Sequence, residues 1–202
     1  MIANVIIQQY IRLIFDLLNY IYPMKKIYPF FLICILFISN SYAQVKPQTV
    51  TKSSVTFHIK NLGITVNGLF AGFKGDIKFD PANLAASTIE ASVETNTIDT
   101  DNGTRNDHLK SDSYFDVAKY PAIMMKSTGF KHKTANSYTG TFNLTIKDIT
   151  KTVEIPFTYT EAGNTASFRG NFQVERSDYG VGGKSLVMSD DVKVDVEITT
   201  AR

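Results

Sequence analysis

Residues 177–187, "SDYGVGGKSLV", contain a Gly-Gly-Lys-Ser run of the kind found in phosphate-binding loops. Such a loop needs a glycine five positions before its Gly-Lys-Ser, so that successive backbone N–H groups can curl around the phosphates. Asp178 occupies that position, and its carboxylate would repel a phosphate. The loop should also open a helix, whereas the next residues, "LVMSDDVKVDVEIT", alternate and are rich in β-branched types, which predicts a strand. We therefore interpret residues 177–187 as a glycine-rich hairpin turn.

The spacing of the histidines does not predict a metal site. His58, His108 and His132 are far apart in the sequence, and the chain has a single cysteine. Residues 99–103, "DTDNG", resemble the start of a calcium loop, but the glycine comes one position early and Lys110 replaces the bidentate glutamate. No Ser-His-Asp or paired-carboxylate motif is evident. We predict no catalytic residues, no metal ligands and no cofactor.

Residues 24–43 have the composition of a secretory signal peptide. Two lysines follow Met24, an apolar run comes next, and small residues precede a predicted cleavage site between Ala43 and Gln44. Residues 1–23 are apolar and lack a basic cluster, so we interpret them as an over-called start or an N-terminal extension, with an uncleaved membrane anchor as the alternative. The mature protein is then expected to be periplasmic or secreted. Its membrane contact would be transient unless the N-terminus stays uncleaved.

Residues 44–202 are long enough for one domain with a sizeable core. The whole chain has 21 Lys+Arg and 19 Asp+Glu, of which three and one precede residue 44, so 18 of each remain in the mature part. Balanced charge without a basic patch gives no support to nucleic acid as a partner. Because the mature part has no cysteine, it must hold together without disulfides, by its core and its ladder hydrogen bonds.

Alternation of apolar and polar residues with period two is the dominant pattern, and it predicts strands. Val55, Phe57 and Ile59, for example, share one face of their segment. Within residues 67–80 the apolar parity changes between Phe70 and Phe73, which predicts a bulge or bend near Ala71 and Gly72. The predicted strands lie in residues 54–60, 67–80, 87–97, 121–127, 138–147, 151–160, 166–175 and 191–199.

One stretch, residues 99–121, interrupts this pattern between the third and fourth predicted strands. Thr104 or Asn106 could cap a short helix that contains Leu109, with residues 114–115 packed beneath it. Eight antiparallel strands with one apolar face each can form a sandwich or a closed barrel. A barrel is favoured because closure removes exposed edges and the parity change suits a bending strand. The predicted fold is therefore all-β, an antiparallel eight-stranded barrel with a short helix between strands 3 and 4.

Four motifs in order along residues 49–198 resemble the YceI-like family of periplasmic polyisoprenoid-binding proteins. They are "TVTKSSVTFHIKNLG…VNGLFAGFKGDIKFD", "TRNDHLKSDSYFDVAKYP", "GTFNLTIKDITKTVEIPFTY" and "RSDYGVGG…DDVKVDVEI". The resemblance implies a lipocalin-like barrel whose apolar tube holds a long isoprenoid or fatty chain, without a defining catalytic activity. It also implies that "RSDYGVGG" links the last two strands, where Arg176 and Asp178 could pin the loop.

Large aromatic rings are abundant in the predicted strands, and they could line a cavity or simply fill the core. They could not all pack in a narrow tube without a gap unless glycines such as Gly68, Gly75 and Gly170 make room for them. We favour a cavity and keep a filled core as the alternative. The predicted apolar lining consists of Phe57, Ile59, Phe70, Phe73, Ile77, Phe79, Val93, Met125, Phe142, Leu144, Phe157, Phe168 and Phe172.

Arg105 and His108 are the polar pair that could meet a lipid head group, such as a pyrophosphate, near the barrel mouth. The alternative for this pair is a helix cap and a surface ion pair. The expected function is that of an exported, non-enzymatic protein that holds a polyisoprenoid or other long-chain lipid for transport or storage. Two alternatives stay open: a structural or stress-related interaction module with a filled barrel, and an enzyme acting on an isoprenoid or amide substrate. A homodimer also stays open.

Overall fold

The computed structural model describes residues 9, 11–14, 16–17 and 44–202, which belong to two separate units divided after Ala43. In the first unit the described residues are helical and exposed. The predicted signal peptide, its cleavage site and most of residues 1–23 lie outside the described residues. Within the described part of the chain, no helix is both long and apolar enough to cross a membrane.

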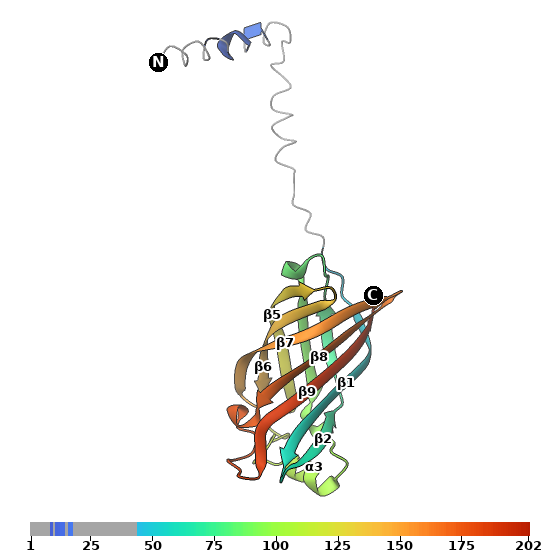
Figure 1. Ribbon diagram of the computed structural model, residues 1–202, viewed down its shortest axis with the longest axis vertical. Coiled ribbons are helices and arrows are strands. Elements are labelled where there is room, and N and C mark those ends of the chain that lie inside the picture. Colours follow the sequence, from blue (N-terminus) through green and yellow to red (C-terminus); the bar gives the residue numbers. More distant parts are fainter. Residues whose placement is uncertain (1–8, 10, 15, 18–43) are drawn as a thin grey trace. The chain divides into compact units, whose positions relative to one another are not determined.

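Residues 44–202 form one antiparallel sheet that curls into a half-barrel (Figure 1). Within these residues the sheet has nine strands in the order β2-β1-β9-β8-β7-β6-β5-β4-β3. The expected all-β antiparallel barrel architecture is thus confirmed, with nine strands in place of eight. The strands are β1 (Thr49–Asn61), β2 (Ile64–Phe70), β3 (Lys74–Lys78), β4 (Thr88–Glu94), β5 (Ala122–Thr134), β6 (Ser137–Ile146), β7 (Ile149–Ala162), β8 (Thr165–Glu175) and β9 (Met188–Ala201).

The extra strand arises because the second predicted strand is divided in two. The chain leaves β2 at Phe70, turns at Gly72, whose φ is +65°, and enters β3 at Lys74. The bend expected near Ala71 and Gly72 is therefore confirmed. Although β2 and β3 are consecutive in sequence, β2 pairs with β1 and β3 pairs with β4, so they form the two opposite edges of the sheet.

A seam beside the start of β1 joins this part of the sheet to the edge strand β3. The backbone N–H of Gln48 donates to the carbonyl of Ile77 on β3, at 2.8 Å. The Gln48 side chain is buried; its Nε2 donates to the Phe79 carbonyl at 2.8 Å, and its Oε1 accepts from the Thr200 hydroxyl at 2.7 Å. These bonds tie β1, β3 and β9 together at one end of the half-barrel. They give partners to backbone groups that an open sheet edge would leave unpaired.

The short helix α3 (Gly103–Lys110) lies between β4 and β5, which are the third and fourth strands of the sequence prediction. Its N-cap is Asn102, whose side chain accepts a hydrogen bond from the Arg105 N–H at 2.9 Å, so the prediction of Thr104 or Asn106 as the cap is wrong. Asn106 instead uses its side-chain oxygen to bind the Thr100 N–H and hydroxyl. Residues 44–202 also contain three 3-10 helices: η1 (Leu84–Ala86), η2 (Thr95–Thr97) and η3 (Arg176–Tyr179).

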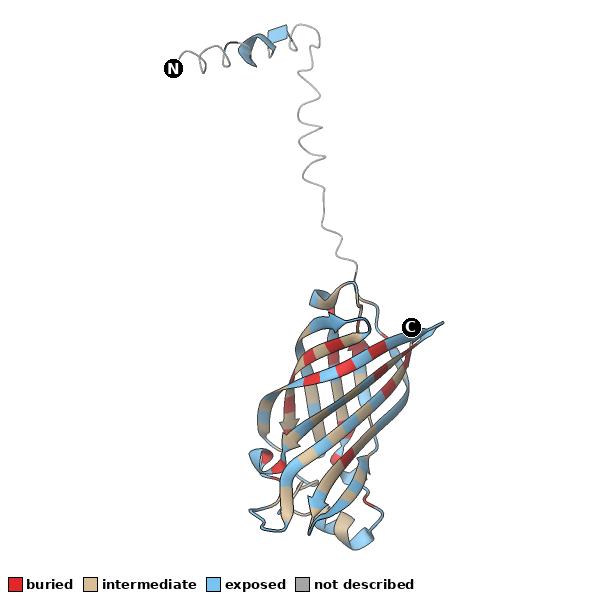
Figure 2. Ribbon diagram, viewed as in Figure 1, coloured by how far each residue is buried: buried red, intermediate tan, exposed pale blue. Residues whose placement is uncertain are grey.

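Burial alternates along the strands, as period-two patterning requires (Figure 2). The inward rings crowd the end of the half-barrel that contains the seam. There Phe79, which is 2 % exposed, contacts five other rings with centroid distances between 4.9 and 5.6 Å. We call this set the aromatic cluster; it comprises Phe79, Phe130, Tyr138, Phe157, Tyr159 and Phe168.

Candidate functional site

An apolar cavity of about 190 Å³ lies inside the half-barrel. Its wall includes residues of α3 and of the loop after η3, and both of these segments lie at the same end of the half-barrel (Figure 1). Inward side chains of β1, β2, β8 and β9 form much of its wall, and α3 with the segment after it contributes Leu109, Tyr114 and Phe115. The polar contribution is small and comes from a few residues that include Thr100 and Arg105. The predicted lining residues found in this wall are Phe57, Ile59, Phe70, Phe73, Val93, Met125, Leu144 and Phe172.

A second, smaller apolar cavity of about 70 Å³ lies toward the aromatic cluster. Its wall includes rings of that cluster together with residues of β3, β4 and β9. The predicted lining residues in this second wall are Phe73, Ile77, Met125, Phe142, Phe157 and Phe168. Phe79 is the one predicted lining residue that the described residues place in neither wall, because it is enclosed by the aromatic cluster.

Two glycines explain how large rings fit beside the cavities. A Cβ on Gly68 would come within 2.3 Å of the Phe57 ring, and a Cβ on Gly75 would come within 3.0 Å of the Phe73 ring. Both distances are shorter than van der Waals contact. The glycines therefore leave room for the rings, yet the interior is not completely filled, since the two cavities remain.

Arg105 lies in the wall of the larger cavity, while His108 is exposed on α3 and lies outside that wall. The Arg105 guanidinium is held by Thr100: Nε donates to the hydroxyl at 2.8 Å and Nη2 to the carbonyl at 2.6 Å. The His108 ring contacts the Tyr114 ring at a centroid distance of 5.6 Å. The structure therefore places Arg105 in the cavity wall and does not bring His108 to the same wall.

Asp99 is anchored beside this group. Its carboxylate accepts from the side-chain amide of Asn106 at 2.9 Å and from the Asp101 N–H at 3.0 Å. These hydrogen bonds hold the pKa of Asp99 below its ordinary value. Asp99 also bridges β2, because its backbone pairs with Leu69. The segment that leads into α3 is thereby fixed to the sheet edge next to Arg105.

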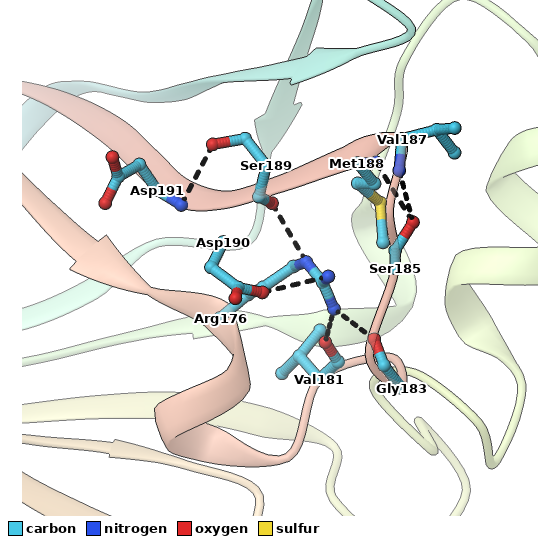
Figure 3. Close-up of polar contacts among 9 residues, drawn as sticks. All are labelled: Arg176, Val181, Gly183, Ser185, Val187, Met188, Ser189, Asp190 and Asp191. Atoms are coloured by element: carbon cyan, nitrogen blue, oxygen red, sulfur yellow. Dashed lines mark hydrogen bonds and ion pairs between the residues drawn. The ribbon is translucent and has the colours of Figure 1, made fainter.

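Arg176 also lies in the wall of the larger cavity, and it fixes the loop between β8 and β9 (Figure 3). Its side chain is 4 % exposed, and it donates to the carbonyls of Val181, Gly183 and Ser189 at 2.9 to 3.0 Å. The Asp190 carboxylate lies 2.9 Å from Nη2, close enough for an ion pair, although its geometry is not that of a hydrogen bond. The prediction that Arg176 pins this loop is confirmed.

The conformation of this loop also explains why the segment is rich in glycine. Gly180 and Gly182 have φ of +62° and +68°, a conformation that favours glycine. Asp178 pairs with Lys151 of β7 at 2.7 Å. The residues after the loop enter β9 and not a helix, so the interpretation as a turn between strands is confirmed.

The family model described as the YceI-like domain matches residues 46–200. The chain belongs to the YceI-like family. A UPF0312 protein of Vibrio cholerae is 30% identical over 173 residues, covering 82% of this chain and 89% of the relative. The crystal structure of Burkholderia cenocepacia BcnA superimposes with a TM-score of 0.70 at 27% identity, covering 73% of this chain and 95% of BcnA. A polyisoprenoid binding domain from Saccharophagus degradans shares the fold, with a TM-score of 0.61 at 13% identity, over 77% of this chain and 97% of that domain.

The wall of this YceI-like cavity also includes residues that the sequence prediction did not name. Val192, Val194 and Val196 of β9 alternate with polar residues, so the period-two signal was present for them. Tyr114 and Phe115 come from the segment after α3, where residues 114–115 were expected to pack but no lining role was assigned. Lining residues on strands can be predicted from the alternation of apolar and polar residues. Lining residues in an irregular segment cannot, because their position depends on how that segment crosses the end of the barrel.

No group of three or more His, Cys, Asp or Glu side chains in the described part of this YceI-like chain is arranged to hold a metal ion. Burial raises the pKa of Tyr179, with a further contribution from the Asp178 carboxylate. Tyr179 is 2 % exposed and packs with Leu144, Ile146 and Val181. This second buried cluster supports the loop that Arg176 fixes.

Proposed function

We propose that this YceI-like protein is an exported, non-enzymatic binding protein that holds a polyisoprenoid or other long-chain lipid, for transport or storage. The observation that carries the proposal is the apolar cavity of about 190 Å³ inside the half-barrel. The relative from Saccharophagus degradans, described as polyisoprenoid binding, supports this ligand class. Export rests on residues 24–43, whose sequence is that of a signal peptide.

An apolar chain suits this cavity because its binding needs only apolar area. Each methylene removed from water contributes about 0.8 kcal/mol, before the cost of ordering the chain is subtracted. The size of the cavity limits how much chain it encloses, since an engineered apolar cavity of about 150 Å³ is filled by a benzene molecule. The cavity would therefore enclose only part of the chain of a long lipid, the part next to a head group at the cavity wall.

We assign the contact with that head group to Arg105. Its guanidinium lies in the cavity wall and is oriented by Thr100 from the segment before α3. A guanidinium can bind a phosphate or a carbonyl through its remaining N–H groups. His108 faces solvent, so a contribution from it would need a head group that extends beyond the cavity.

Native mass spectrometry of the mature protein, purified without detergent, tests this function. We expect hydrophobic molecules to co-purify, or added prenyl alcohols and fatty acids to bind. Val192→Asn, which puts an amide into the cavity wall, should weaken lipid affinity by about fivefold or more, because an unpaired buried amide costs about 1–3 kcal/mol. Val187→Asn is the matched control, since Val187 is 53% exposed. Absence of bound lipid under every condition, or equal loss in both variants, would contradict the proposal.

A further inference from the structure

Within residues 44–202, the two apolar cavities have four wall residues in common: Phe73, Ala91, Met125 and Val196. They come from the connection between β2 and β3 and from strands β4, β5 and β9. Because the same side chains face both spaces, they lie where the larger cavity adjoins the smaller one. We call these four residues the partition. Beyond the smaller cavity lies the aromatic cluster.

The volumes of the two cavities indicate that the partition limits the length of chain that can be enclosed. The cavities measure about 190 and about 70 Å³. Ligand pockets for drug-sized molecules usually measure about 300–1,000 Å³. Neither cavity, nor both together, reaches that range. The depth to which a chain can enter is therefore decided by whether the partition lets it reach the second cavity.

Two members of the partition are large enough to block the passage, and both are only half-buried. Phe73 lies in the connection between the edge strands, outside regular pairing, and Gly75 leaves space beside its ring. Met125 is on β5, and an unbranched thioether side chain adapts easily to its surroundings. Ala91 is small, and Val196 sits on the regular strand β9.

The aromatic cluster behind the second cavity is more deeply buried and more tightly packed than Phe73 and Met125. Phe79 is 2 % exposed and is held by five neighbouring rings. Four of them make T-shaped contacts at centroid distances of 5.3 to 5.6 Å, and Tyr159 makes a tilted contact at 4.9 Å. Gln48 further fixes the backbone of Phe79 by its hydrogen bond at 2.8 Å. A chain that passed the partition would end at this cluster.

We propose that Phe73 and Met125 determine the length of chain that the protein prefers, by limiting how deeply an apolar chain enters, with the aromatic cluster as the final stop. The inference rests on the proposed lipid-binding function. It assigns chain-length specificity to two residues that touch both cavities.

The test measures the affinity of the mature protein for saturated fatty acids of increasing length, and for geraniol, farnesol and geranylgeraniol, by displacement of a fluorescent fatty acid. In the wild type, affinity should rise by about fourfold per methylene until the chain reaches the partition and then level off. In Phe73→Ala and in Met125→Ala, the rise should continue to longer chains before it levels off.

Two matched controls line the larger cavity alone. Phe70→Ala removes a ring of the same size as Phe73, and Leu144→Ala removes a side chain comparable to Met125. Both should change affinity for all chains alike and leave the preferred length unchanged. Circular dichroism at the assay temperature verifies that each variant is folded. If one partition variant does not fold, the other decides the test.

The outcomes separate this inference from the function on which it rests. Binding by the wild type with the same preferred length in both partition variants would overturn the partition and leave the lipid-binding function standing. A longer preferred length in the controls as well would also overturn it, because any added space would then suffice. If the wild type binds no chain of any length, both the proposed function and the partition are wrong.

Discussion

Arg176 shows how one buried cation can organise a loop. Its guanidinium reaches three backbone carbonyls, of Val181, Gly183 and Ser189, in the loop and at the start of β9. A planar group with five N–H donors is suited to this task, since a lysine could not reach the same acceptors in a fixed geometry. The half-exposed Asp190 carboxylate balances the charge at 2.9 Å.

Arg176→Ala should lower the free energy of unfolding by about 3 kcal/mol or more, because three carbonyls lose their donor and part of the cavity wall is removed. Urea denaturation of both proteins measures the difference. Arg169→Ala is the matched control: Arg169 pairs with Glu197 at 3.1 Å, but both side chains are more than half exposed. That variant should lose less than about 1 kcal/mol. Equal losses in the two variants would show that Arg176 is not a structural anchor.

Strand pairing alone does not close the half-barrel, because β2 and β3 lie at opposite edges of the sheet. The seam at Gln48 links the start of β1 to the β3 side, with the buried Thr200 hydroxyl of β9 as its other partner. Gln48 precedes the first residue of β1, Thr49. A single side chain therefore joins the beginning of the first strand to the third and the last.

Gln48→Ala should reduce the free energy of unfolding by about 2–3 kcal/mol, because the Phe79 carbonyl and the fully buried Thr200 hydroxyl would both lose their partner. Gln173→Ala changes the same residue type at an exposed position of β8 and should stay within about 0.5 kcal/mol of the wild type. Thermal and urea unfolding provide the comparison. A Gln48→Ala protein as stable as the control would mean that the seam does not contribute to closure.

Elements that depend on side-chain alternation could be predicted from the sequence, and elements that depend on a distant partner could not. Strand β1 places Phe57 inward as its parity predicts. The division of β2 from β3 escaped prediction because each half takes its register from a different neighbour. The cap of α3 was misplaced because Asn102, Thr104 and Asn106 are all acceptable cap types, and the choice depends on Asn106 being engaged by Thr100.

The same distinction applies to the site. Eight of the thirteen predicted apolar lining residues lie in the wall of the larger cavity, and all of them except Phe73 alternate on strands. The depth of that cavity could not be predicted, since it depends on where rings from many strands meet. Phe79 illustrates this limit: its parity is inward, yet contacts with rings such as Tyr159 and Phe168 make it part of the closed end. The half-barrel is thus packed at one end and hollow at the other.

The packed end also makes the free energy of unfolding depend on pH in the alkaline range. Tyr159 is 3 % exposed, and its hydroxyl donates to the Glu161 carboxylate at 2.8 Å. Burial first, and then Glu161, raises the pKa of Tyr159 to about 12, from an ordinary value of 10.0. Arg202, which pairs with Glu161, acts in the opposite direction. The folded state therefore retains this proton after the unfolded chain has released it.

The sign of the pH effect follows from this difference. Below pH about 10 both states are protonated and the stability from Tyr159 is fully present; between about 10 and 12 the unfolded state alone ionises, so the free energy of unfolding falls by up to about 1.4 kcal/mol per pH unit. Tyr179, whose pKa is also raised, contributes in the same direction. Urea unfolding at pH about 9 and about 11 should show this loss in the wild type and a smaller loss in Tyr159→Phe, which keeps the ring but has no proton to release. Because exposed groups titrate alike in both proteins, an identical loss would mean that the aromatic end does not shield Tyr159 from ionisation.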